Sequence, residues 1–163
     1  MPVARRYDAA MVRRYLQLRL AAAAAAALMS LPAHAIFAVT EAWVRPAAMG
    51  KATEAYMQLM SSDGATLVDV RSDAAASVSL LTAGGRRIAP MSLALPAGDT
   101  VWLAPGKQRL ALARLARTQR EGDRVPFVLL VRMGDGTTQE IAVDAEVRHH
   151  SPTDDHLNPH HHH

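Results

Sequence analysis

The sequence predicts an all-β domain, an antiparallel sandwich or barrel, over roughly residues 37–147. Two observations support this fold class. Short apolar or alternating runs recur at a spacing of roughly 8–15 residues. Clusters of Gly, Pro, Asp and Ser lie between the runs, and these residues favour turns. The chain that follows a predicted leader is about 128 residues long, which suits a single domain.

Each expected strand is one such run, and turn signals divide the runs. The first three are 37–45, 54–60 and 66–72, separated by Arg45-Pro46 and Ser62-Asp63-Gly64. No internal repeat is visible. The remaining runs are 77–82, 91–96, 100–105, 108–115, 125–133 and 137–147, and the later signals are Ala83-Gly84-Gly85, Pro96-Ala97-Gly98-Asp99, Pro105-Gly106, Glu121-Gly122-Asp123 and Gly134-Asp135-Gly136.

A helix over Leu110 to Arg120 is the competing prediction for the second half of the chain. Ala, Leu, Arg and Gln are good helix formers, and they dominate this segment. Its apolar positions Leu110, Leu112 and Leu115 follow a period of two that then breaks. This pattern favours a strand that enters a loop.

Residues 1–35 have the order of a secretory signal peptide. A basic stretch is followed by an apolar run and by the small-residue site Ala33-His34-Ala35. The apolar run is about fifteen residues long, which is too short to span a bilayer of about 30 Å. We therefore expect an exported chain that begins near Ile36 and has no stable membrane insertion afterwards; the alternative is an uncleaved amino-terminal anchor.

Cleavage two residues earlier would expose His34, which could chelate a metal through its amine and its ring. That cut would place Leu31 at the −3 position, where a small residue is required. His34 is therefore not counted as a site residue.

Charge and cysteine content exclude several classes of function. The whole chain has 18 Lys+Arg against 15 Asp+Glu, but the leader holds five arginines and one aspartate, which leaves 13 against 14. A near-neutral domain lacks the basic stripe that nucleic-acid binding requires. Because there is no cysteine, disulfides, thiolate nucleophiles and Cys-ligated metal sites are excluded.

The composition changes abruptly after Val147. Residues 148–163 have no apolar periodicity, contain two prolines and are almost entirely polar or titratable. Nothing there offsets the entropy of ordering the backbone, so we expect a disordered tail. The tail also holds every histidine of the chain that begins at Ile36: His149, His150, His156, His160, His161, His162 and His163.

These seven histidines are the candidate metal ligands. A flexible His-rich segment can fold imidazoles around Cu(II), Ni(II) or Zn(II), with Cu(II) favoured by intrinsic affinity. Without thioether or thiolate groups it has little preference for Cu(I). The alternative is a truncated purification tag; the intact leader and the spread of His149, His150 and His156 argue against it.

Catalytic chemistry is not predicted. The sequence contains no G-x-S-x-G, H-E-x-x-H, P-loop or G-x-G-x-x-G signature. A body without histidine or cysteine also lacks the usual general base and the strongest nucleophile. Glu121 and Asp123 are paired acids, but they lie in a turn signal, where a structural role is expected.

The order of landmarks in the body resembles that of the PCu(A)C family of periplasmic copper chaperones, and this resemblance implies a cupredoxin-like Greek-key β-sandwich over residues 36–147. The matching pieces are Ala42-Trp43-Val44-Arg45-Pro46, Thr53, Ala55-Tyr56-Met57, Leu59, the segment from Leu67 to Ser72 with Ala75, Val78-Ser79-Leu80, Leu95-Pro96-Ala97-Gly98, the segment from Val101 to Gly106, Leu112, Leu115, and Glu121-Gly122-Asp123-Arg124-Val125-Pro126 before the run 127–133.

The resemblance also implies where copper would be held, namely by two histidines and two methionines. Laid on that pattern, this chain has Leu81 and Ile88 at the first two positions, and Arg109 and Ala111 at the His-x-Met pair. Leu, Ile and Ala have no donor atom, and arginine stays protonated and repels a cation. We therefore expect the buried copper site of the family to be degenerate.

The methionines of the body are weak substitutes. Met91 is the one nearby thioether that a shifted alignment could use, but methionine is usually a core filler. Met57 and Met60 would point to opposite faces of a strand, and Met49 lies in a loop with no nearby histidine.

The sequence thus predicts a periplasmic, copper-chaperone-like protein that is not an enzyme. It would bind copper, more readily Cu(II) than Cu(I), or Zn(II) or Ni(II), through its tail, for buffering or for delivery to a copper-accepting protein. The alternative is a non-metal interaction module that docks a partner through Arg86, Arg87 and the segment from Arg109 to Arg120.

Overall fold

The computed structural model describes residues 35–152, and the predicted leader and most of the tail lie outside them. The described chain is all-β, as predicted, and it contains no helix. Its strands are β1 (Phe37–Val44), β2 (Thr53–Ser61), β3 (Ala65–Arg71), β4 (Ala75–Leu81), β5 (Arg87–Ile88), β6 (Leu93–Leu95), β7 (Thr100–Leu103), β8 (Arg109–Leu115), β9 (Arg124–Met133) and β10 (Thr138–Val147).

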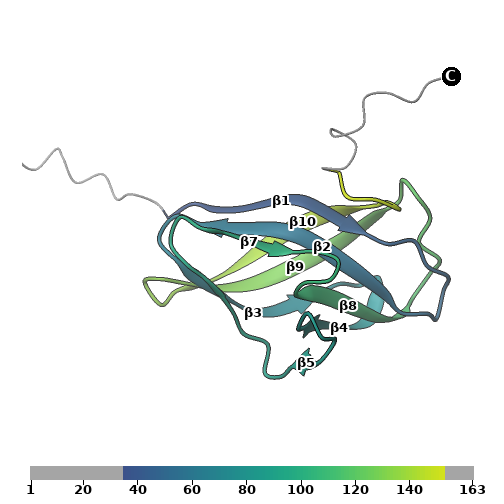
Figure 1. Cartoon of the computed structure of the whole chain (residues 1–163), viewed down its shortest axis with the longest axis horizontal. Coiled ribbons are helices and arrows are strands. Elements are labelled where there is room, and N and C mark those ends of the chain that lie inside the picture. Colours follow the sequence, from purple (N-terminus) through teal and green to yellow (C-terminus); the bar gives the residue numbers. More distant parts are fainter. Residues whose placement is uncertain (1–34, 153–163) are drawn as a thin grey trace, which may run out of the picture. The chain divides into compact units, whose positions relative to one another are not determined.

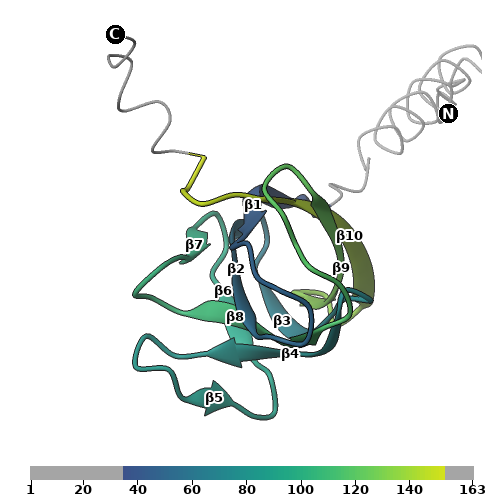
Figure 2. The ribbon, with the colours of Figure 1, turned by 90° about the vertical axis from the view of Figure 1, so that its right-hand side faces the viewer.

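The strands form one mixed sheet that curls around the core (Figures 1 and 2). Its order is β5-β4-β8-β2-β1-β10-β9-β3-β6, with β7 paired to β2 beside β8. The predicted antiparallel sheet is wrong at one place: β1 and β10 are parallel, with Trp43 opposite Glu146 and Val44 opposite Val147. Alternation fixes which face a side chain takes but not the direction of the neighbouring strand, so the sequence could not give this pairing.

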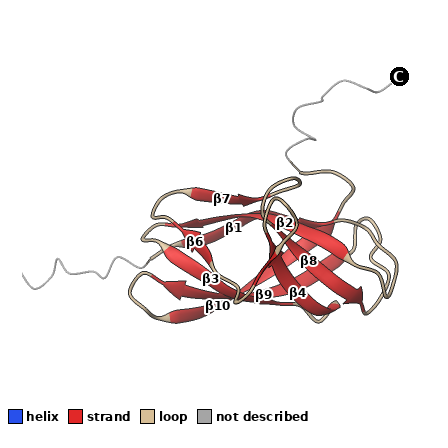
Figure 3. Cartoon of the chain, turned by 60° about the horizontal axis from the view of Figure 1, so that its bottom comes forward, coloured by secondary structure: helices blue, strands red, loops and turns tan. Residues whose placement is uncertain are grey.

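The core fills the concave side of the curled sheet. Strand β9 shows the simplest pattern, because every second residue from Val125 to Met133 is buried. Strands β2, β8 and β3 contribute further buried side chains, among them Met57, Leu59, Leu110 and Leu67. Figure 3 shows that strands and loops make up the whole described body.

The helix considered for the segment from Leu110 to Arg120 is excluded, because residues 109–115 form β8. Leu110, Leu112 and Leu115 are all buried, although Leu115 departs from the period of two. The alternation breaks at Arg114, whose φ of 51° lies in the left-handed region. The short strand β5 was not predicted; two residues are too few to show a pattern.

Candidate metal site

The four positions that the sequence assigned to a degenerate copper site come together where β4, β5 and β8 run side by side. Leu81 of β4 lies opposite Arg109 of β8, and two residues earlier Ser79 lies opposite Ala111. Ile88 of β5 pairs with Leu80, the neighbour of Leu81. Leu81, Arg109 and Ala111 therefore share one face of the sheet, whereas Ile88 shares the opposite face with the buried Leu80 and packs against the core.

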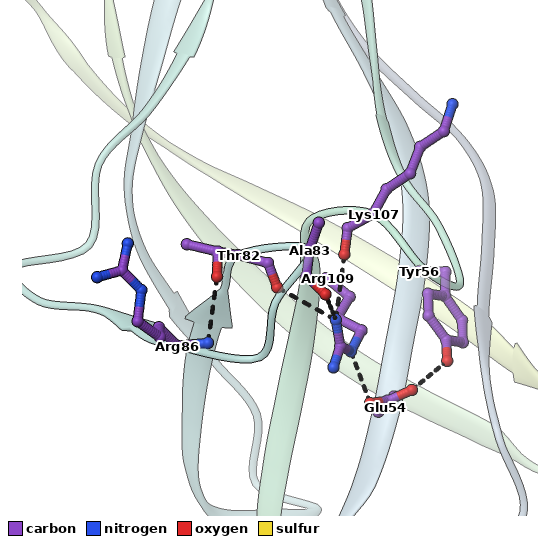
Figure 4. A network of polar contacts seen from close by, with 7 residues as sticks. All are labelled: Glu54, Tyr56, Thr82, Ala83, Arg86, Lys107 and Arg109. Atoms are coloured by element: carbon purple, nitrogen blue, oxygen red, sulfur yellow. Dashed lines mark hydrogen bonds and ion pairs between the residues drawn. The ribbon is translucent and has the colours of Figure 1, made fainter.

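Arg109 fills this region with a network of polar contacts (Figure 4). Its Nε donates to Glu54 Oε1 of β2 at 2.6 Å. Its Nη1 donates to the backbone carbonyls of Thr82 at 3.2 Å, Lys107 at 3.2 Å and Ala83 at 3.4 Å. One guanidinium thus links the loop after β4 to the turn before β8, which is the kind of cross-link that a bound cation would supply.

The loop after β4 is shaped to receive this guanidinium. Gly85 has a φ of 81°, which a residue with a side chain rarely adopts, and its N–H donates to Thr82 O at 3.0 Å. A Cβ at Gly85 would lie 3.7 Å from Arg109 Nη2. The guanidinium thus leaves space for a Cβ at this position, and the positive φ is what requires the glycine.

Glu54 accepts a second hydrogen bond on its other oxygen, from the buried Tyr56 hydroxyl. Burial raises the pKa of the Glu54 carboxyl, but the hydrogen bonds from Tyr56 and Arg109 and the charges of Arg109 and Arg45 outweigh it and hold this pKa below its ordinary value. Burial and the Glu54 hydrogen bond raise the pKa of Tyr56. The carboxylate is therefore ionised and fully engaged at neutral pH.

Aromatic groups extend the network beyond Glu54. The Trp43 and Tyr56 rings lie 4.5 Å apart between centroids, and the Arg45 guanidinium lies 5.6 Å from the Tyr56 centroid. Sequence reasoning missed Glu54 and Tyr56 as members of this region. Glu54 is the second residue of β2, and the sequence alone shows only an isolated acid at this position. The acid comes to face Arg109 because β2 pairs with β8.

The arrangement is closed to an incoming metal ion. Leu81 and Ile88 are half-buried and offer no donor atom, and the Arg109 cation takes the place of one. Arg109 is also too enclosed to belong to a docking surface, since its side chain is only 16 % exposed. The alternative that used this residue for docking is corrected on that point.

The methionines of the body do not replace the missing metal ligands. Met57 is buried in the core, and Met60 on the other face of β2 is half-buried. Met91 packs partly against the core. Met49 is 66 % exposed in a loop, as the sequence predicted.

Two of the seven predicted tail ligands, His149 and His150, lie within the described residues and are exposed. Their ring centroids lie 6.4 Å apart. They line two adjacent clefts, one of about 420 Å³ with Trp43, Arg45, Trp102, Ala104 and Pro105, and one of about 120 Å³ with Glu121, Glu146 and Arg148. The other predicted ligands, His156 and His160 to His163, lie outside the described residues.

No group of three His, Asp or Glu side chains in residues 35–152 is arranged to hold a metal ion. The described part of the tail supplies a pair of histidines and, beside them, one carboxylate: His149 Nε2 lies 3.8 Å from Glu121 Oε2. The structural role predicted for the acids of this turn is confirmed for Asp123, whose Oδ2 accepts the Arg120 N–H at 2.8 Å. For Glu121 the prediction missed the contact with His149.

The curled mixed sheet defines the class of protein, since it matches solved PCuAC domains. The apo PCuAC domain from PmoF1 aligns with a TM-score of 0.58 and 21% identity over 71% of this chain and 98% of that domain. The copper-bound PCuAC domain from PmoF2 gives the same score and identity over 71% and 97%. The solution structure of Cu(I)-DR1885 from Deinococcus radiodurans aligns with a TM-score of 0.54 and 28% identity over 75% and 85%.

A family model supplies the assignment. Residues 37–147 match the family described as "Putative lipoprotein LpqE-like", so the chain belongs to the LpqE-like family, and its fold is that of PCuAC domains. The predicted recognition is thereby confirmed. No curated protein sequence matches this chain.

The family description implies a location outside the cytoplasm. Within residues 35–152, the structure contains no helix with the length and apolar character needed to cross a membrane.

Proposed function

We propose that this protein is a periplasmic, non-enzymatic copper-binding protein that holds copper through its His-rich tail and buffers it or passes it to a copper-accepting protein. The body would act as a cupredoxin-like Greek-key scaffold. The ligands would be His149, His150, His156 and the four terminal histidines, with Cu(II) preferred to Cu(I) and Zn(II) or Ni(II) as competitors.

One observation carries the proposal: the Arg109 guanidinium, 2.6 Å from Glu54, stands where the family resemblance places metal ligands. A permanent cation among half-buried aliphatic side chains repels a metal ion and leaves no lone pair to bind it. The histidines of the tail are then the donor groups that remain.

The described start of the tail and the region around Arg109 are both in contact with the turn between β7 and β8. Ala104 and Pro105 line the cleft that contains His149 and His150, and the carbonyl of Lys107 in the same turn accepts a hydrogen bond from Arg109. An ion held at the root of the tail would therefore stand near the loops that surround the family's copper position. A recipient that docks against those loops would meet the ion there.

The test is a metal titration of two chains, one from Ile36 to His163 and one that ends at Val147, both purified without an added tag. We expect the longer chain to bind Cu(II) and Zn(II) and the shorter chain to bind neither. A third chain ending at Pro159 removes only the four terminal histidines and measures their share. Tight Cu(I) binding by the chain that ends at Val147 would contradict the proposal.

A second candidate function, a non-metal interaction module, is favoured by one observation. Arg86 and Lys107 are exposed in the loops around the closed network (Figure 4), and Arg87 is exposed in β5. Together they form a basic edge for an acidic partner. This candidate predicts that neither chain binds metal, and that Arg86→Ser together with Arg87→Ser abolishes capture of a partner from the exporting cell.

A further inference from the structure

The turn that carries Glu121 is fixed to the end of β10. Gly122 N–H donates to Val147 O at 2.9 Å, and Val147 N–H donates to Asp123 O at 2.8 Å. Gly122 has a φ of 87°, so the turn depends on a glycine at this position. Glu121 is therefore held at a constant place next to the point where the tail leaves the sheet.

The tail leaves that point along a fixed path. Arg148 N–H donates to Val44 O at 2.9 Å, which ties the first residue after β10 to β1. His149 follows directly and faces Glu121, with 3.8 Å between Nε2 and Oε2. Both side chains are well exposed, at 60 % and 68 %, so an ion can reach them from solvent.

The spacing of these two atoms suits a shared ion. Two ligand atoms at about 2.0–2.2 Å from one tetrahedral metal lie roughly 3.3–3.5 Å apart. The 3.8 Å between His149 Nε2 and Glu121 Oε2 needs only a small side-chain adjustment to meet that value. His150 lines the same cleft of about 120 Å³ and is the next donor within reach.

The other acid of the cleft is already engaged. Glu146 lies 3.4 Å from Arg148 Nε and 3.8 Å from Arg124 Nη2, so two arginines share its carboxylate. Within residues 35–152, Glu121 forms no ion pair with an arginine or a lysine, and it faces the His149 imidazole instead. The cleft therefore offers one carboxylate for an ion, and that carboxylate belongs to the body rather than to the tail.

We propose that Glu121 is a ligand of the metal bound by the tail, and that it anchors a divalent ion, Cu(II) or Zn(II), at the root of the tail together with His149 and His150. The inference rests on the proposed function. A carboxylate oxygen is a hard donor, so its participation favours a divalent ion over soft Cu(I).

The experiment measures Zn(II) and Cu(II) affinity by calorimetry in the chain from Ile36 to His163, its Glu121→Gln and Glu121→Asp variants, and a Glu140→Gln control. Glu140 is 61 % exposed and paired with Arg71, so this control makes the same change in charge away from the cleft. We expect Glu121→Gln to weaken binding by about tenfold or more, Glu121→Asp to recover part of the loss, and Glu140→Gln to have no effect.

A chain that ends at Pro152 supplies a second readout, because it retains every described residue, including His149, His150 and Glu121. We expect it to keep weak Zn(II) binding that Glu121→Gln abolishes. Equal affinities of Glu121→Gln and Glu140→Gln, in a chain whose binding still requires the tail, would overturn the role of Glu121 and leave the proposed function intact. Absence of divalent binding by the chain from Ile36 to His163 would overturn both.

Discussion

The region around Arg109, which aligns with the copper position of the family, and the described start of the tail each contain a carboxylate that faces a nitrogen group. The two pairs differ in exposure and in the chemistry of the nitrogen. Glu54 lies 2.6 Å from Arg109 Nε, and the two side chains are 34 % and 16 % exposed. Glu121 lies 3.8 Å from His149 Nε2, and these side chains are 68 % and 60 % exposed. Arginine cannot release its proton, whereas imidazole can offer a lone pair. The first pair leaves no lone pair for a metal ion, and the second pair is the one that the proposed function assigns to metal binding.

This difference suggests how the fold can persist in a chain that lacks the family's histidine and methionine ligands. A bound cation and a guanidinium both carry positive charge and both connect loops, so Arg109 can replace the structural effect of a metal without its chemistry. The three backbone carbonyls that Arg109 reaches would otherwise lack this partner. Arg109 thus connects these loops without a metal ion, and the proposed function assigns metal binding to other residues.

The largest effect is expected from restoring the family ligands in the chain that ends at Val147. The variant combines Leu81→His, Ile88→Met, Arg109→His and Ala111→Met. Because β4 and β8 already place positions 81 and 109 opposite each other, we expect Cu(I) affinity to rise by at least 100-fold, or about 2.8 kcal/mol. Competition against a colorimetric Cu(I) chelator measures it.

The matched control keeps Arg109 and carries the other three substitutions. If the internal cation excludes copper, this control should gain almost no affinity, because its guanidinium still repels the ion. Equal Cu(I) binding by the control and the full variant would show that charge at position 109 does not close the site.

The next effect concerns the stability that Arg109 gives the body. Removing one partner of a fully buried ion pair costs about 3–5 kcal/mol, and since Glu54 is partly exposed we expect about 1–3 kcal/mol for Arg109→Met or Glu54→Gln alone. The double variant should lose less than the sum, because neither charge is left unpaired. Urea unfolding of the four chains measures the coupling free energy.

The exposed pair Arg71–Glu140 is the comparison for this cycle. Its side chains are 57 % and 61 % exposed, so its coupling should be about 0–1 kcal/mol. Similar coupling energies for the two pairs would mean that Arg109 is an ordinary surface residue rather than a replacement for a bound cation.

The sequence predicted the body well because its information is local. Nine of the ten strands coincide with runs divided by turn residues, and Leu110 and Leu112 show the buried face of β8 directly. Pairings between distant segments were not predictable in the same way. Glu54 and Arg109 are 55 residues apart and meet only through the register of β2 and β8, and nothing in either segment marks the partner.

The same limit applied to the tail. Counting histidines identified the candidate ligands, but it treated Glu121 as a turn residue and the tail as an isolated segment. The contact with His149 depends on the hydrogen bonds that join the turn at Gly122 to Val147. The number of histidines suggested that the tail could bind a metal. The contact between the Glu121 carboxylate and the His149 imidazole became visible only in the folded chain.

The smallest expected effect is a pH dependence that only the closed pair should show. The Glu54 carboxyl has a pKa below its ordinary value of 4.5, because the hydrogen bonds of Tyr56 and Arg109 and the nearby arginines outweigh the effect of burial. A lowered pKa in the folded state gives stability that is present above pH 4.5 and is lost as the pH falls through the folded value. Glu54→Gln should therefore flatten the stability profile on the acid side.

Urea unfolding between neutral pH and the acid limb measures this slope, with Glu121→Gln as the control. Glu121→Gln makes the same change in charge at a side chain that is 68 % exposed, so the comparison of the two variants isolates the contribution of Glu54. The distinction between the two pairs would be contradicted if Glu121→Gln removed the pH dependence of the unfolding free energy on the acid side. It would also be contradicted if Glu54→Gln kept that pH dependence. The contrast between them would then need another physical cause.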